Sequence, residues 1–284
     1  MTTFVWAAVL GAALLHALWN AVVKNAADKV MGSARVALWT GVVATLVALA
    51  TPAPSAASLP FVIASALIHV VYFLLVGLLY RNADLSVAYP MMRGLAPLVA
   101  TALAAVALHE VPDPVALVGV LALVGGVAAM GLSGLAERRI DRATLVVALA
   151  NSLIIAVYSV LDGEGARLAG PDAAHAFAYN AWSDALTAAL YLPVVMAMRG
   201  RAAVPELFRD PAASAFAGLA AFGGYAIVVW AMTQAPIGAV AALRECSVAF
   251  AAIIGVALLG EPFKGTRAGA ALLIVGGVVA LRLA

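Results

Sequence analysis

Long apolar stretches separated by short polar breaks run through the whole chain. Each has roughly 20 residues, about the length that a helix needs to cross a hydrocarbon core of roughly 30 Å. The breaks contain Pro, Gly or charged residues, as at 51–54 and at 162–165. The pattern predicts an all-α integral membrane protein with ten transmembrane helices. These are expected at 3–23, 30–50, 60–80, 85–108, 114–134, 143–162, 173–198, 212–233, 237–259 and 265–283.

The composition leads to the same class of protein. Hydrophobic residues make up 65% of the 284 residues and charged residues only 11%, whereas soluble domains have about 25% charged residues. So few charges cannot cover this much apolar surface in water, so the lipid bilayer is the expected environment. The net charge of +2 and the scattered bases argue against a nucleic-acid partner. The single Cys246 excludes a disulfide framework and a cysteine-built metal site, and neither a metal nor a cofactor is expected.

Basic residues are unevenly distributed between the two ends of the predicted helices. Twelve of the sixteen Lys and Arg residues lie in or beside the connections that follow the first, third, fifth, seventh and ninth helices. Positively charged connections stay on the cytoplasmic side of a membrane. The distribution therefore predicts that both termini lie on the opposite, outer side.

The second half of the chain repeats the first at a distance of 151 residues. This shift places Arg93 on Arg244 and Glu110 on Glu261. Each repeat contains five predicted helices, an odd number, so the second copy is inverted relative to the first. Inverted repeats are typical of secondary transporters, whose substrate site lies near the midplane between the halves. The predicted units are a first repeat at 1–135, a connecting loop at 136–142 and a second repeat at 143–284.

The end of the ninth predicted helix carries a family signature. Leu-Gly-Glu-Pro at 259–262, followed by a glycine-rich last helix up to Gly276 and Gly277, resembles the signature of EamA repeats. A looser copy, His-Glu-Val-Pro, stands at 109–112. EamA repeats build the drug/metabolite transporter (DMT) superfamily, whose ten-helix members contain two five-helix copies. The resemblance covers essentially the whole chain and implies an exporter in the bacterial inner membrane, so the outer side on which the charge distribution places both termini is the periplasm. Superfamily substrates include amino acids, sugars, nucleotide sugars and drugs.

Two arginines lie inside the predicted membrane helices. A charged residue at a helix centre costs about 2.5–3.5 kcal/mol on insertion scales, so each one needs a partner or a function. Arg93 and Arg244 enter from opposite sides and are expected to lie symmetrically about the midplane. They could attract the anionic part of a substrate, or tie helices together by bonding to carbonyls. Glu245 could bind an amine, carry a proton or pair with an arginine, and structural pairing is slightly favoured.

A histidine and a tyrosine share one face of the third predicted helix. His69 and Tyr72 are three residues apart, and such a histidine can bind a ligand or simply bond to a neighbouring helix. The His-x-x-Tyr pattern is similar to a cavity-lining pattern on the third helix of bacterial exporters of aromatic and other amino acids. The fourth helix departs from those exporters, because Tyr89 is followed by Pro and two Met, with no Trp. This departure favours a broad, Met-lined pocket as much as one specific for aromatic side chains.

Polar residues form stripes on three further predicted helices. The first helix has His16, Asn20 and Lys24 at intervals of four, with Trp19 beside them. The sixth helix has Asn151, Tyr158 and Asp162. The seventh has Asn180, Asp184, Thr187 and Tyr191, flanked by Tyr179 and Trp182. Such stripes are typical of a wet central cavity, although hydrogen bonding between helices produces the same pattern.

Enzyme and channel signatures are missing from the sequence. It contains no His-Glu-x-x-His zinc motif and no Gly-x-x-x-x-Gly-Lys phosphate loop, and no ring of charges typical of a pore. The polar residues instead spread over both halves at mid-depth. This distribution favours transport over catalysis or conduction.

The sequence therefore predicts a secondary transporter that exports amino acids, aromatic or broadly neutral, by alternating access. Cationic or aromatic drugs, or another metabolite such as a sugar, are the alternative substrates. Both passive facilitation and proton exchange stay open, and a monomer is sufficient for this function. The expected substrate-binding residues are Trp19, Asn20, His69, Tyr72, Tyr89, Arg93, Tyr158, Trp182, Asp184, Arg244 and Glu245.

Overall fold

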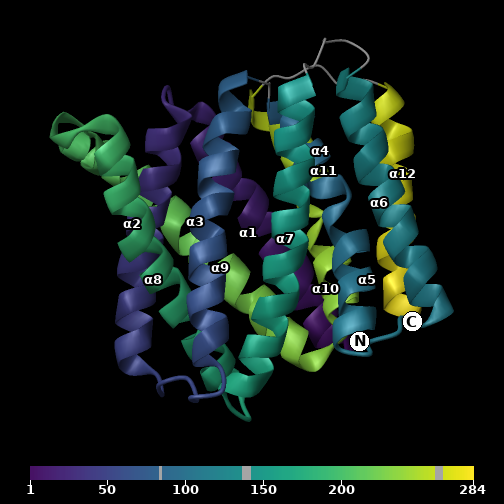
Figure 1. The fold of residues 1–284 in the computed structure, drawn as a ribbon. Helices are drawn as coiled ribbons and strands as arrows, with labels where there is room; N and C mark the ends of the chain where they lie inside the picture. Colours follow the sequence, from purple (N-terminus) through teal and green to yellow (C-terminus); the bar gives the residue numbers. More distant parts are fainter. Residues whose placement is uncertain (83–84, 136–141, 260–264) are drawn as a thin grey trace.

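The computed structural model describes residues 1–82, 85–135, 142–259 and 265–284, and all regular structure in these ranges is helical. Most of the helices run side by side as one bundle (Figure 1). The helices are α1 Thr3–Asn25, α2 Lys29–Ala50, α3 Leu59–Asn82, α4 Leu85–Gly94, α5 Ala96–Ala107, α6 Pro114–Leu135, α7 Arg142–Ala169, α8 Ala173–Arg199, α9 Pro211–Gln234, α10 Ile237–Arg244, α11 Ser247–Leu259 and α12 Gly265–Leu283. A short 3-10 helix, η1 Arg201–Phe208, connects α8 to α9.

The outer surface of the bundle is apolar. Phe4, Leu46 and Leu49 are 73%, 64% and 80% exposed, and many other large apolar side chains share this position. Eight helical segments of the described residues are long and apolar enough to cross a membrane, and shorter apolar stretches lie in α6 and α12. An apolar surface of this extent is suited to lipid contact. The prediction of an all-helical, multi-pass membrane protein is therefore confirmed.

Aspartate side chains cap the starts of α2 and α8. Asp28 accepts hydrogen bonds from the backbone N–H groups of Val30 and Met31 at 2.9 and 3.2 Å, and so caps α2. Asp172 caps α8 by accepting from the backbone N–H of His175 at 3.1 Å. A second hydrogen bond from the His175 ring, together with this one, lowers the pKa of Asp172 below its usual value. Both caps satisfy N–H groups that a helix start leaves without an intrahelical partner.

The predicted helix at 85–108 is interrupted at Leu95. Gly94 ends α4, and Pro97 lies in the first turn of α5. Proline has no backbone N–H, so it cannot continue the hydrogen-bond ladder of a preceding turn. The prediction of one continuous helix is therefore corrected to two half-helices, with Arg93 in the last turn of the first.

The predicted helix at 237–259 is interrupted in a similar way, but without a proline. The backbone N–H groups of Glu245 and Cys246 bond to carbonyls three residues back, instead of the four that an α-helix requires. This tightening separates α10 from α11 and makes Arg244 the last residue of α10. Cys246, which lies in the interruption, is buried.

Helix α7 is longer than the sequence predicted. A break was expected at 162–165, but α7 runs through this segment, so that prediction is wrong. A Cβ atom at Gly163 would lie 2.5 Å from Cδ1 of Ile237, and one at Gly165 would lie 2.5 Å from Cε2 of Tyr179. The two glycines therefore allow α10 and α8 to pack closely against α7, and they do not form a turn.

Helices α6 and α12 pack against each other through glycines. A Cβ atom at Gly126 or Gly277 would come within 2.8 or 2.7 Å of a backbone oxygen of the other helix. Their sequence neighbours Gly125 and Gly276 have nothing within 4 Å, and neither does Gly269. One glycine of each pair therefore permits the close approach that helix association in lipid requires, whereas Gly269 does not contribute to it.

Candidate functional site

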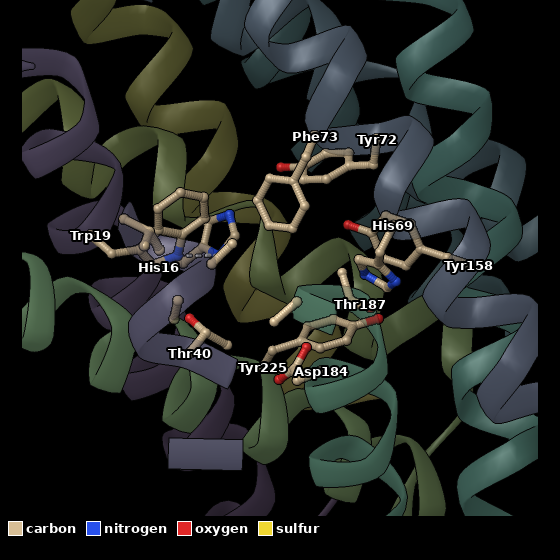
Figure 2. A pocket seen from close by; sticks show the side chains of 14 residues that line it. His16, Trp19, Thr40, His69, Tyr72, Phe73, Tyr158, Asp184, Thr187 and Tyr225 are labelled. Carbon is tan, nitrogen blue, oxygen red and sulfur yellow. Dashed lines mark hydrogen bonds between the residues drawn. The ribbon is translucent and has the colours of Figure 1, made fainter. Parts of the chain in front are cut away.

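A cavity opens between six helices, α1, α2, α3, α7, α8 and α9. Its empty volume, which includes open solvent at its mouth, is about 590 Å³. The side chains labelled in Figure 2 are His16, Trp19, Thr40, His69, Tyr72, Phe73, Tyr158, Asp184, Thr187 and Tyr225. The walls thus combine aromatic rings with a few polar groups, which is the usual chemistry of a small-molecule site.

Four rings from three helices form one wall, which we call the aromatic box: His69, Tyr72, Tyr158 and Tyr225. The centroids of His69 and Tyr158 are 4.3 Å apart, and those of Tyr72 and Tyr158 are 5.8 Å apart. Tyr225 completes the box, 5.9 Å from Tyr158 and nearly perpendicular to it. Edge-to-face arrangements of this kind are favourable, and they present apolar ring surface together with hydroxyl groups.

Hydrogen bonds fix the ring of His69 within the box. Its Nδ1 atom lies 3.0 Å from the backbone oxygen of Ser65 and 3.2 Å from the Ser65 hydroxyl. The hydroxyl of Ser183 on α8 donates to the same Ser65 hydroxyl at 2.9 Å. These contacts hold the imidazole in one orientation on the cavity wall.

Two aspartates lie at or near the cavity and differ in their surroundings. Asp184 lines the cavity and accepts a hydrogen bond from the side-chain amide of Asn180 at 3.0 Å. Asp162 is fully buried behind the aromatic box, and both of its oxygens accept tyrosine hydroxyls, one from Tyr179 at 3.0 Å and one from Tyr225. Asp184 is therefore the carboxylate placed to meet a ligand, whereas Asp162 orients the tyrosines.

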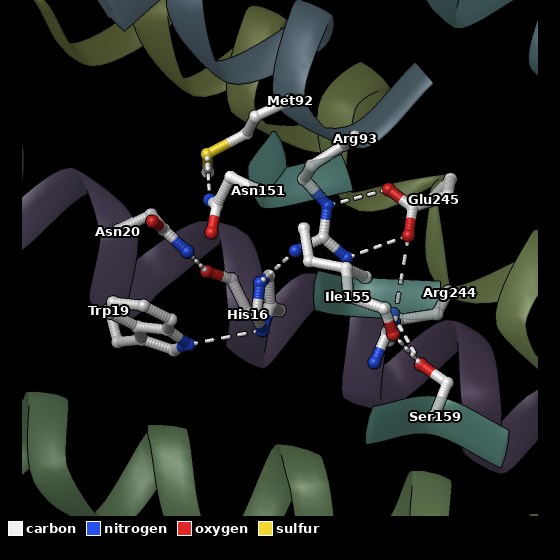
Figure 3. A network of polar contacts seen from close by, with 10 residues as sticks. All are labelled: His16, Trp19, Asn20, Met92, Arg93, Asn151, Ile155, Ser159, Arg244 and Glu245. Carbon is white, nitrogen blue, oxygen red and sulfur yellow. Dashed lines mark hydrogen bonds and ion pairs between the residues drawn. The ribbon is translucent and has the colours of Figure 1, made fainter. Parts of the chain in front are cut away.

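Arg93 is the centre of a buried ionic network that Figure 3 shows. Its Nε and Nη2 atoms donate to the two carboxylate oxygens of Glu245 at 2.5 and 2.8 Å. Its Nη1 atom lies 2.7 Å from Nε2 of His16, a residue of the cavity wall. Arg93 and Glu245 are 0% and 1% exposed, so the pair is excluded from solvent. A bidentate pair of this kind fixes both side chains.

The guanidinium group of Arg244 has fewer and longer polar contacts than that of Arg93. Its Nη2 atom contacts the Ser159 hydroxyl at 3.4 Å, and its Nε atom lies 3.6 Å from Glu245. Within the described ranges, its Nε and Nη1 atoms have no hydrogen-bond partner although they are buried. The guanidinium instead lies 5.8 Å from the ring of Tyr158 and 6.0 Å from that of Tyr225. Among the described residues, both arginines of this central cluster therefore lie near the carboxylate of Glu245.

The structure brings some of the predicted site residues to the cavity and places others elsewhere. Those that line the cavity are Trp19, His69, Tyr72, Tyr158 and Asp184. Arg93, Arg244, Glu245 and Asn20 are buried outside its lining. Trp182 is 42% exposed and does not line the cavity. The side chain of Tyr89 lies outside the described residues. The neighbouring Met92 is fully buried and accepts from the Asn151 amide at 3.1 Å, so it does not contribute to the pocket.

Sequence reasoning did not identify Tyr225, Phe73 and Thr40 as lining residues. Tyr225 was detectable, because it is a tyrosine in the interior of an apolar helix and follows the glycine pair 223–224. Phe73 and Thr40 gave no such signal, since single residues of these types are common in membrane helices. Among the described residues, no group of three or more His, Cys, Asp or Glu side chains is arranged to hold a metal ion.

Comparisons with known proteins agree with this architecture. The profile of the EamA-like transporter family matches residues 142–283, which is half of the chain. Among solved structures 19 chains match, including one described as "Crystal structure of protein". It aligns with a TM-score of 0.74 at 19% identity, over 99% of this chain and 96% of that chain, and shows the fold alone. No curated protein matches.

The helical membrane fold together with the family match indicates a membrane transporter of small molecules. The family match is more specific: the chain belongs to the EamA-like transporter family, within the DMT superfamily.

Proposed function

We propose that the protein is a secondary transporter that exports amino acids, aromatic or broadly neutral, across the bacterial inner membrane by alternating access. The observation that carries this proposal is the cavity between six helices, which places an apolar aromatic box beside a carboxylate. A free amino acid has the complementary groups, an apolar side chain and an ammonium group. In this assignment the aromatic box receives the side chain, and Asp184 receives the ammonium group.

The helix interruptions support a ten-helix inverted repeat of two five-helix units, 1–135 and 143–284. If each pair of half-helices counts as one span, the described helices make ten spans. The interruptions at Leu95 and Cys246 are equivalent under the 151-residue shift that relates Arg93 to Arg244. Discontinuous helices at corresponding positions of two inverted halves are typical of transporters that rock around a central site.

The ends of the bundle support the proposed orientation. Both termini lie at one end, the lower end of Figure 1, and the η1 segment with its bases lies at the other. Lys29, Arg199, Arg201 and Arg209 belong to that second end. Because positive charge accumulates on the cytoplasmic side, the termini are assigned to the periplasm.

Export of cationic or aromatic drugs is the second candidate function. It is favoured by the fact that Asp184 and the aromatic box line the cavity, whereas neither Arg93 nor Arg244 does. Aromatic rings around a cation are a common way to recognise quaternary ammonium groups. Such a substrate would need no group that binds a carboxylate, and this difference separates the two functions.

The experiment that tests the proposal uses purified protein in liposomes preloaded with mixed amino acids, with entry of labelled phenylalanine or methionine as the readout. Unlabelled amino acids, sugars and quaternary ammonium compounds serve as competitors. The double variant His69→Ala with Tyr72→Ala removes part of the aromatic box and should abolish uptake. His175→Ala, which lies at the start of α8 away from the cavity, is the matched control and should retain it.

The possible results separate the candidate functions. Uptake that only amino acids inhibit, and that the double variant loses, would support amino-acid transport through this cavity. Uptake of a labelled quaternary ammonium compound without uptake of amino acids would favour drug export, and the same result with a labelled sugar would favour a sugar substrate. Folded protein with no amino-acid uptake above that of empty liposomes would refute the amino-acid proposal.

A further inference from the structure

His16 on the cavity wall contacts two groups that can only donate hydrogen bonds. Its Nε2 atom lies 2.7 Å from Nη1 of Arg93, and its Nδ1 atom lies 3.2 Å from Nε1 of Trp19. A guanidinium and an indole N–H have no acceptor atom, and a neutral imidazole has one acceptor nitrogen. A protonated imidazole has none. His16 can therefore accept only one of these two hydrogen bonds.

The contact with Arg93 determines which ring nitrogen is the acceptor. Arg93 is permanently charged, and its bidentate pair with Glu245 holds it in place. Its contact with His16 is also the shorter of the two, as expected for a charge-assisted hydrogen bond. Nε2 of His16 therefore accepts from Arg93, and the ring proton is on Nδ1, because the bond made by one ring nitrogen sets the tautomer of the other.

With this tautomer, the cavity wall presents two neighbouring N–H donors. The Nδ1–H of His16 and the Nε1–H of Trp19 lie 3.2 Å apart, and both residues line the cavity. In this tautomer neither nitrogen can accept from the other, and in the described part of the chain neither N–H has another acceptor. An oxygen atom on the cavity side of the pair, about 2.9 Å from both nitrogens, would accept from both. Buried donors without an acceptor cost free energy, so such an oxygen is favoured.

We propose that these two N–H groups, from His16 and Trp19, form the carboxylate-binding site of the cavity. This inference rests on the proposed function and names the residues that receive one end of the amino acid. Figure 2 shows His16 and Trp19 on the opposite side of the cavity from His69 and Tyr158. The ammonium and carboxylate groups are thus received by different residues, Asp184 and the His16–Trp19 pair.

The charge behind this wall favours an anion over a neutral acceptor. Arg93 directly contacts His16, and Arg93 and Arg244 both lie near the carboxylate of Glu245. The guanidinium group of Arg93 thus lies directly behind His16 in a region of low dielectric, where electrostatic interactions are strong. Arg93 is thus a positioning residue that fixes the tautomer of His16 and adds charge, without touching the substrate.

Trp19→Phe tests the proposal, because it removes one N–H donor and keeps an aromatic ring. Trp39→Phe is the matched control, since its indole N–H is buried, has no hydrogen-bond partner in the described ranges and lies outside the cavity lining. Inhibition constants are measured in liposomes for phenylalanine and for phenethylamine, which lacks the carboxylate. Loss of one hydrogen bond to a charged group should weaken phenylalanine binding by about tenfold or more.

Trp19→Phe is expected to raise the inhibition constant of phenylalanine and to leave that of phenethylamine unchanged. Trp39→Phe is expected to change neither constant. An equal effect of Trp19→Phe on both ligands, or no effect, would overturn the assignment. The wild-type protein gives an independent test if Trp19→Phe does not fold. Equal inhibition by the two ligands would overturn the carboxylate site, and at least about tenfold preference for phenylalanine would support it. A wild-type protein that transports no amino acid would instead refute the proposed function itself.

Discussion

Arg93 and Glu245, which are 152 positions apart in the chain, form a buried bidentate ion pair with hydrogen bonds of 2.5 and 2.8 Å. Arg93 is contributed by α4, and Glu245 by the interruption between α10 and α11. The pair therefore joins the two broken helices at the centre of the bundle. Removing one partner of such a pair leaves the other charge buried and without its counter-ion.

Glu245→Gln should strongly destabilise the protein for this reason. Loss of one partner of a buried ion pair lowers the free energy of unfolding by about 3–5 kcal/mol, so the thermal unfolding temperature in detergent should fall clearly. Arg199→Gln is the control, because Arg199 pairs with Asp28 at 2.9 Å on the partly exposed surface. A pair of that kind contributes about 0–1 kcal/mol. Equal shifts for the two variants would show that the central pair has no special role.

Substitution of two adjacent glycines on α12 by alanine should have different effects on the stability of the protein. In Gly277→Ala the new Cβ atom would lie 2.7 Å from the backbone oxygen of Gly119, so α6 and α12 must separate. Overpacking of this kind lowers stability by about 1–3 kcal/mol. Gly276→Ala places its methyl group in open space and should leave stability unchanged or slightly higher. The unfolding temperatures of the two variants check this, and a destabilised Gly276→Ala would contradict the assigned helix faces.

Asp184→Asn should weaken the binding of amino acids and amines by about tenfold, because a hydrogen bond to a charged group is replaced by a neutral one. Uptake of N-acetylated amino acids, which have no ammonium group, should not fall. Asp172→Asn makes the same chemical change at the start of the same helix, and asparagine keeps the cap. Competition assays in liposomes measure the affinities of both variants for these ligands and test the prediction. If Asp172→Asn had the same effect, Asp184 would have no specific role at the ammonium group.

Tyr225→Phe and Tyr179→Phe should both lower the stability of the protein, but only Tyr225→Phe should change substrate affinity. Each removes one of the two hydroxyls that donate to the fully buried Asp162, so each should lower stability by about 1.5–3 kcal/mol. Tyr225 also lines the cavity, whereas Tyr179 does not. Substrate affinity should therefore change only in Tyr225→Phe. Unfolding temperatures together with inhibition constants test both parts, and an affinity change in Tyr179→Phe would argue against this division.

The sequence alone predicts an all-helical membrane protein, because this class depends on the length and apolar character of the helices. Both properties can be read directly from the order of the residues. The sequence did not predict that α7 continues through 162–165, because Gly is both a helix breaker and the residue that permits close packing. The distinction depends on the partners of Gly163 and Gly165, which are Ile237 and Tyr179 of other helices. Such tertiary contacts are not visible in a local pattern.

Helical periodicity predicts which residues of one helix share the face that lines the cavity. Asp184 and Thr187 are one turn apart on α8, and both line the cavity. Trp182 lies two residues before Asp184, about 200° around the helix, and it is exposed on the outside. The pairing of Arg93 with Glu245 was not predictable, because it depends on how two interrupted helices meet.

The burial of the only cysteine has a practical consequence. Cys246 is 4% exposed, and a thiol that is closed off in an apolar environment reacts slowly with maleimides. Cysteines introduced at exposed positions can therefore be labelled selectively without prior removal of the native thiol. Spin labels or fluorophores placed at the two ends of the bundle would then report distance changes during the transport cycle of an otherwise unaltered protein.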